Sequence, residues 1–202
     1  AKAKDFWGKH GKKLTIVSLA VIVLIGGWYG YKNFVVLPKQ QKASELIFPA
    51  EKLFVSMTQS GSFTKDSVNV ILNGGNLNGT VVNGLLKIIS GYDGTPAANL
   101  AQYMTGACYL QLKEFDKATK YLKAFDGNGA GQIQSAAYRM LGDAYAEQKK
   151  NDEAFSSYKK AIDAASEKDE STRFQALSRA ALFCNATGKN KEAIELFTQI
   201  KK

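Results

Sequence analysis

The feature that most constrains the fold of this chain is a pattern of small and large residues that recurs between residues 97 and 202. Each of the first two copies has a glycine, a tyrosine three residues later, an alanine twelve after the glycine and a large residue four further on. These positions are Gly106, Tyr109, Ala118 and Leu122 in the first copy and Gly142, Tyr145, Ala154 and Tyr158 in the second. Small residues let two helices approach closely, and large ones fill the remaining space. The pattern therefore predicts one helix pair per copy.

A third copy is less regular. It keeps Gly188 at the turn, Ala193 and Phe197, but has Ala181 in place of the glycine and Cys184 in place of the tyrosine. The copies are offset by 36 and 39 residues. The pattern resembles the tetratricopeptide repeat, a helix–turn–helix unit of roughly 34 residues, so slightly lengthened turns are expected between units. The resemblance implies an α-solenoid with a concave surface lined by the first helix of each unit.

Two earlier segments, 39–57 and 80–89, also have helical periodicity, and the Gly/Asn-rich segment 59–84 between them is expected to be an inserted surface loop. The predicted fold class is all-α, with one N-terminal transmembrane helix followed by a tetratricopeptide-like solenoid of about eight helices. The expected divisions are a basic cytoplasmic tail (1–13), the anchor helix (14–37), a degenerate repeat with the loop (38–96) and three repeats (97–202).

The segment 14–31 contains no charged residue, and 18 helical residues are long enough to cross the hydrocarbon part of a bilayer. A cleaved signal peptide would have a shorter apolar run followed by a small-residue cleavage site, and the exit through Gly26–Gly27–Trp28–Tyr29–Gly30–Tyr31 has none. The aromatic residues there are typical of a membrane interface, as are Phe6 and Trp7 on the other side. We therefore expect an uncleaved anchor. Pro38 is expected to break this helix or to start the next one.

Five lysines precede the apolar run, at positions 2, 4, 9, 12 and 13. By the positive-inside rule they predict a cytoplasmic N-terminus and a C-terminal domain across the membrane, which is the periplasm for a bacterial inner-membrane protein. Gly26 and Gly30 have the G-x-x-x-G spacing that lets a second membrane helix approach closely, although glycine is also simply common in membrane helices.

Several function classes lack support in the sequence. From residue 39 onward there are 21 basic and 17 acidic residues, too even a balance for a nucleic-acid-binding domain. The single histidine, His10, precedes the anchor, so no Ser-His or Cys-His pair can form in the domain after it. Cys108 and Cys184 have no metal-ligand spacing and are expected to be buried free thiols. No glycine-rich segment has a phosphate-loop pattern. We expect no enzyme, metal site or cofactor.

The partner-binding surface is expected on the first helix of each repeat. By resemblance to the tetratricopeptide repeat, the groove residues are Leu100, Tyr103, Leu110 and Gln111 in the first unit, Arg139, Asp143 and Glu147 in the second, and Gln175, Ser178, Leu182 and Asn185 in the third, with the small residues Ala107, Ala136, Ala146 and Ala186 beside them. Such a groove suits an extended or helical polypeptide. The alternative is that the 59–84 loop covers several of these residues.

The whole layout resembles the YfgM-type family of bacterial inner-membrane proteins, especially its Bacteroidota members. The resemblance rests on the basic tail, the anchor, its aromatic-glycine exit, the Pro38 junction, the 73–89 segment and the repeats. It implies an ancillary subunit of the SecYEG translocon that works beside the anchored chaperone PpiD and receives emerging polypeptides. It also implies that Ser67, in Asp66–Ser67–Val68, fits a Bacteroidota O-glycosylation site.

The leading hypothesis is therefore a membrane-anchored, translocon-associated scaffold with a chaperone-like groove. The alternative is a tetratricopeptide scaffold for assembly of another cell-envelope or secretion complex. A third hypothesis, an enzyme or signalling regulator, has no motif in its favour.

Overall fold

The computed structural model describes residues 2–77 and 79–200 of the chain, and the side chains of 2–7, 9–11 and 14 are outside this description. The tail lysines at positions 2, 4 and 9, His10 and the aromatic pair Phe6 and Trp7 therefore lie outside the described side chains. The chain separates into an N-terminal unit, 1–42, and a C-terminal unit, 43–202.

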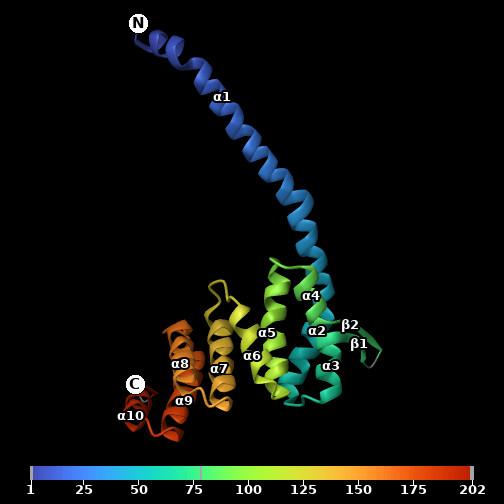
Figure 1. The fold of residues 1–202 in the computed structure, drawn as a ribbon, viewed down its shortest axis with the longest axis vertical. Helices are drawn as coiled ribbons and strands as arrows, with labels where there is room; N and C mark the ends of the chain where they lie inside the picture. The colour runs from blue at the N-terminus through green and yellow to red at the C-terminus, as the bar shows by residue number, and fades with distance from the viewer. Residues whose placement is uncertain (1, 78, 201–202) are drawn as a thin grey trace. The chain divides into compact units, whose positions relative to one another are not determined.

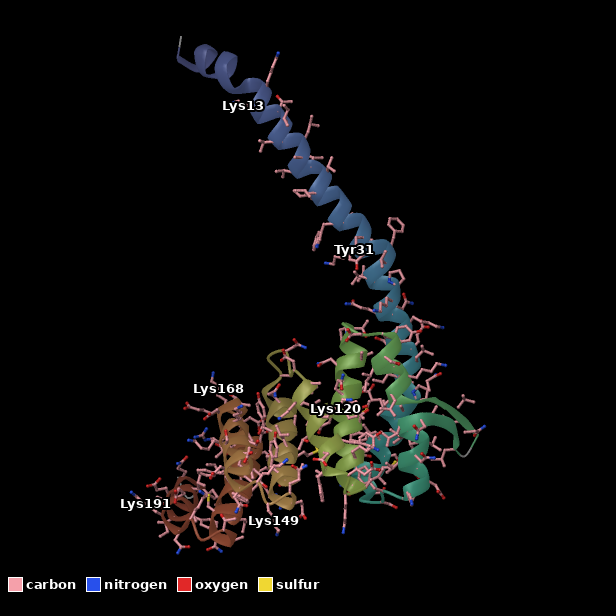
Figure 2. All side chains as sticks on the ribbon, viewed as in Figure 1. Lys13, Tyr31, Lys120, Lys149, Lys168 and Lys191 are labelled. Atoms are coloured by element: carbon pink, nitrogen blue, oxygen red, sulfur yellow. The ribbon has the colours of Figure 1, made fainter. Side chains whose placement is uncertain are left out.

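The N-terminal unit is helical throughout its described length. It contains α1 (Lys2–Tyr31), a π-helical turn η1 (Lys32–Val36) and the start of α2 (Leu37–Ser60). Apolar side chains of α1 between residues 16 and 31 are exposed, among them Val23 and Leu24. Figure 2 shows side chains projecting from more than one side of this helix between Lys13 and Tyr31. Within the part of the chain that the structure describes, one helical segment, 15–60, is long and apolar enough by length and composition to cross a membrane.

The turn η1 explains how the helix accommodates Pro38. A proline inside a regular helix donates no hydrogen bond, and its ring collides with the carbonyl four residues earlier. Here the N–H of Leu37 bonds to the carbonyl of Lys32, which widens the turn just before the proline. Pro38 then lies in the first turn of α2, so it begins the next helix and does not end the helical path.

Ten elements complete the C-terminal unit. They are α3 (Lys65–Asn73), β1 (Gly74–Leu77), β2 (Thr80–Asn83), α4 (Leu85–Gly91), α5 (Pro96–Gln111), α6 (Phe115–Ala124), α7 (Gly131–Glu147), α8 (Asn151–Ala164), α9 (Glu170–Ala186) and α10 (Asn190–Ile200). Figure 1 shows α5 to α10 following one another as successive helix pairs. The described fold is all-α apart from one hairpin, and the predicted solenoid is confirmed.

The expectation of a loop over 59–84 and a helix from residue 80 was wrong. The segment contains α3 and the antiparallel hairpin β1–β2, in which Gly74 pairs with Asn83 and Leu77 with Thr80. Thr64 caps α3, because its hydroxyl accepts a hydrogen bond from the N–H of Ser67 at 3.2 Å. The β-branched residues after Gly79 favour a strand, and the next helix, α4, begins only at Leu85.

The hairpin is fixed to the helices by a close backbone crossing. A Cβ at Gly84 would overlap the backbone of Asn73. Any residue other than glycine would therefore be excluded from this position by a steric clash. Val82 is buried beneath the hairpin, whereas its neighbour Val81 is 67% exposed, as expected for alternate residues of a strand. Ser67 is half-buried in the first turn of α3, and its hydroxyl is 2.7 Å from that of Thr64. Its glycosylation stays a prediction.

The contacts predicted between the helices of one repeat are present. A Cβ at Gly106 would lie 2.5 Å from Cγ of Leu122, and a Cβ at Gly142 would lie 2.5 Å from Cε1 of Tyr158. The alanines at 118, 154 and 193 are buried at the same helix interfaces. The helix pairs therefore pack as closely as the small residues in the sequence indicate.

Both cysteines are buried free thiols, as predicted. Cys108 lies in a core built mainly from α2, α3, β2, α4 and α5, and Cys184 lies in a second core built mainly from α7 to α10. Burial raises the pKa of Cys108 to about 12, and it also raises the pKa of Cys184.

The turn inside each repeat has one geometry in all three copies. Its key residue has positive φ, at Lys113 (60°), Lys149 (61°) and Gly188 (75°). The N–H of the following residue bonds to a carbonyl five residues earlier, at 2.9 Å in each copy. This closure is typical of a helix ending in a left-handed residue, a position that favours glycine. The turn residues are offset by 36 and 39 residues, the same as the helices.

Two of these three turns therefore hold a lysine in a conformation that costs a side chain about 1–2 kcal/mol. We expect Lys149→Gly to raise the free energy of unfolding by about 0.5–1 kcal/mol, because the relief of strain exceeds the entropy cost of glycine. Gly188→Ala should lower it by a similar amount. Urea unfolding followed by circular dichroism measures both. Destabilisation by Lys149→Gly would show that the lysine side chain itself holds the turn.

Candidate functional site

The candidate site is the face formed by α5, α7 and α9, the first helices of the three repeats. Of the residues predicted to line it, Gln111, Glu147, Gln175, Leu182 and Asn185 are exposed. Leu100, Tyr103, Leu110, Arg139, Asp143 and Ser178 are half-buried, and of their small neighbours Ala107 is buried. The face is thus more open at the second and third units than at the first.

The first unit is closed by aromatic packing. The ring of Tyr103 on α5 lies 6.3 Å, centroid to centroid, from Phe54 of α2 and 5.4 Å from Phe125, which follows α6. Phe54 in turn packs edge-on against Phe63, in the turn before α3, at 6.1 Å. Ala107 is only 6% exposed. The side chain that covers Tyr103 is Phe54 of α2, and the inserted segment contributes Phe63, which packs on Phe54. That the 59–84 segment itself covers groove residues stays a prediction.

A polar cluster joins the second and third units. Asp143 of α7 accepts two hydrogen bonds on its Oδ1, one from the hydroxyl of Tyr158 at 2.7 Å and one from Nε of Arg179 at 2.7 Å. Tyr158 is on α8 and Arg179 on α9, so one carboxylate links three helices. Burial and the neighbouring Asp143 raise the pKa of Tyr158. The hydrogen bond that Arg179 donates to Asp143 raises the pKa of Arg179.

Arg139 lies one helical turn before Asp143 on α7 and has no such partner. Its Nε is buried without a hydrogen-bond acceptor, and no carboxylate of the described residues forms an ion pair with it. Burial lowers the pKa of Arg139, although Tyr103 and Asp143 favour its charged form. Leaving a buried charged donor unsatisfied costs about 1–3 kcal/mol or more. Nε of Arg139 is therefore a donor without an acceptor among the described residues.

A small cavity opens on the third-unit side of this cluster. It has a volume of about 260 Å³ and is lined by Ala146, Tyr158, Arg179, Leu182, Phe183 and Ala186. Leu182 is 55% exposed at its mouth. Three of the lining residues, Ala146, Leu182 and Ala186, were predicted groove positions, and the structure brings them together.

Two residues of the candidate site, Arg179 and Tyr158, are not among the predicted groove residues. Arg179 directly follows Ser178, which was predicted, and Tyr158 was assigned to the core between α7 and α8. The signal for both was Asp143, because a carboxylate on the inner face of a solenoid requires a donor on the neighbouring helix. Among the described residues, no group of three His, Cys, Asp or Glu side chains is placed to hold a metal ion.

Comparison with known proteins supports the repeat architecture. Residues 135–168, which include α8 and most of α7, match the family "Tetratricopeptide repeat". The C-terminal unit is a tetratricopeptide-like solenoid. A structure of MamA (residues 41 to the end) from Desulfovibrio magneticus RS-1 is similar with a TM-score of 0.52 and 19% identity, over 75% of this chain and 73% of that chain. A double mutant of MamA from strain RS-1 gives 0.52 and 20% over the same shares. No curated protein sequence matches the chain.

The Tyr158–Asp143 bond can be tested without removing the packing of the ring. Tyr158→Phe deletes only the hydroxyl and should lower the free energy of unfolding by about 1.5–3 kcal/mol, because it removes one hydrogen bond to a charged acceptor. Tyr121→Phe is the matched control, since its ring stacks on Tyr109 at 5.5 Å and its hydroxyl has no hydrogen bond in the described structure. Urea unfolding of the two variants compares them. Equal stabilities would contradict a structural role for the Asp143 cluster.

Proposed function

We propose that this protein is a membrane-anchored scaffold of the bacterial inner membrane that binds emerging polypeptides or partner proteins on its solenoid and associates with the SecYEG translocon. The observation that carries the binding role is the open part of the face formed by α7 and α9. There Arg139, whose Nε has no acceptor among the described residues, and an apolar cavity lined by Ala146 lie about 10 Å apart along α7, on repeats of a kind that bind proteins through this surface.

The membrane role is supported by the apolar part of α1, residues 15–31. Its apolar side chains are exposed, and a helix that is apolar all round needs either a protein core or a lipid environment. Trp28, Tyr29 and Tyr31 are exposed at its end, and Nζ of Lys32 lies 5.1 Å from the ring centroid of Trp28. This grouping is typical of the interface between lipid and water.

The proposed orientation places the N-terminus in the cytoplasm and the repeats in the periplasm, from the lysine excess before the apolar run. Protease added to intact spheroplasts should digest the C-terminal unit and leave a short membrane-protected fragment that contains Trp28. Resistance of the whole chain, with digestion only after lysis, would place the repeats in the cytoplasm instead.

Association with SecYEG, and with an anchored chaperone such as PpiD, is proposed from the resemblance to YfgM-type proteins. A tether of this kind raises the local concentration of the repeats at their partner without tight binding. Gly26 and Gly30 are candidates for the helix contact, because nothing of the described chain lies within 4 Å of a Cβ added at either position. That side of α1 is therefore available to a second membrane helix.

The association is tested by affinity purification from native membranes in mild detergent. We expect SecYEG subunits to be enriched with the intact chain, and the double substitution Gly26→Leu with Gly30→Leu to reduce their recovery several-fold. Gly27→Leu is the control for each single substitution, Gly26→Leu or Gly30→Leu, because it adds one leucine side chain at a different position around α1, also with nothing within 4 Å. Enrichment of a different envelope complex would favour the alternative assembly scaffold. Recovery of the protein alone would contradict both.

A further inference from the structure

The concave face contains two cations and one anion at its centre. Arg139, Asp143 and Arg179 influence one another electrostatically, and the only carboxylate of the three is already bonded to Tyr158 and Arg179 through a single oxygen. Arg139 retains a buried Nε with no acceptor. An arginine presents its donors in a planar fork that matches a carboxylate. No described side chain hydrogen-bonds the half-buried Arg139 guanidinium, and Asp143 offsets its charge only in part, so an anion from outside the described chain would complete its pairing.

The cavity on the third-unit side defines the second part of the ligand. Its lining combines Ala146, Leu182, Phe183 and Ala186 with the ring of Tyr158 and the side chain of Arg179. Aliphatic and aromatic walls of this size accept one apolar side chain. Because Arg179 belongs both to this lining and to the ion pair with Asp143, the apolar and charged parts of the site are continuous.

The spacing and orientation of a bound polypeptide follow from the positions of Arg139 and Ala146 along α7. Arg139 and Ala146 are seven residues apart, which is about 10 Å along a helix axis. An extended polypeptide covers that distance in about three residues. Glu147, exposed one residue beyond Ala146, disfavours a second ligand carboxylate at the cavity end. A ligand with its carboxylate at Arg139 and its apolar side chain near Ala146 fits both ends.

We propose that the second and third repeats bind a polypeptide segment in which a carboxylate pairs with Arg139 and an apolar side chain two or three residues away enters the cavity beside Arg179. This inference rests on the proposed polypeptide-binding function and specifies which segments are recognised. The carboxylate comes from an Asp or Glu side chain or from the free C-terminus of the bound chain.

The test uses the full-length protein in detergent micelles and a panel of fluorescein-labelled Gly/Ser dodecapeptides. Each peptide carries one Leu and, two or three residues to either side, a Glu; its matched peptide carries Gln, and both ends are blocked. A further peptide ends in a free carboxylate three residues after Leu. Fluorescence anisotropy gives each Kd. We expect at least one peptide with a Glu or with a free C-terminus to bind about tenfold tighter than its uncharged match. The kind of peptide that shows this preference, Glu or free C-terminus, identifies the source of the carboxylate.

Arg139→Gln should abolish this discrimination, whereas Arg139→Lys should keep part of it. Arg173→Gln is the matched control, because Arg173 lines cavities beside α10 and is absent from the Asp143 cluster. Thermal unfolding of each variant confirms that it is folded. Arg139→Gln should melt no lower than the intact chain, since it removes a charge without a partner.

Three outcomes would overturn the proposal. Equal affinity for Glu and Gln peptides would show that the ligand carboxylate does not pair with Arg139. Polypeptide binding, and with it the proposed function, would still stand. Binding of inorganic phosphate that displaces the Glu peptide at similar concentrations would make this a free-anion site. Absence of binding by every peptide would reject the site itself, while the purification of the anchored protein with SecYEG would still test the proposed function independently.

Discussion

The contact between the two helices of each repeat is the constraint on which the candidate site depends. At Gly142 no side chain separates the backbone of α7 from the ring of Tyr158, so the ring lies directly against the helix. The hydroxyl of that ring then reaches Asp143, the next residue on α7. In the first repeat the equivalent large residue is Leu122, which has no hydroxyl. The same small-residue contact therefore sets helix spacing in both repeats but orients a carboxylate in only one.

The two ends of the concave face differ for a reason common to solenoids. Each repeat is covered on one side by the element before it and on the other by the element after it. Phe54 of α2 covers the first repeat, and Tyr103 fills the remaining space there. In the third repeat Leu182 stays exposed. The polar cluster of Asp143, Tyr158 and Arg179 lies at the border of the second and third repeats, where the side chain of Arg179 is exposed.

The repeats could be predicted from the sequence because their spacing is a local property of helix pairs. Gly106, Gly142 and the buried alanines occupy the positions that the pattern indicates. The sequence does not distinguish the hairpin from a loop. The two short strands depend on Gly84 crossing the backbone of Asn73, a contact between distant parts of the segment. Likewise, Asp143 and Arg139 were predicted to line the groove, but which of them is paired is decided by α9. The role of Arg179 follows only from that packing.

The burial of the two cysteines bears on the redox chemistry of the compartment in which the domain is proposed to fold. Disulfide exchange requires a thiolate, and at pH 7 a thiol with a pKa of about 12 is ionised in roughly one molecule in 10⁵. Cys108 and Cys184 also belong to different cores, so neither is placed to attack the other. In the folded solenoid both thiols are therefore shielded by the core and poorly placed for disulfide exchange.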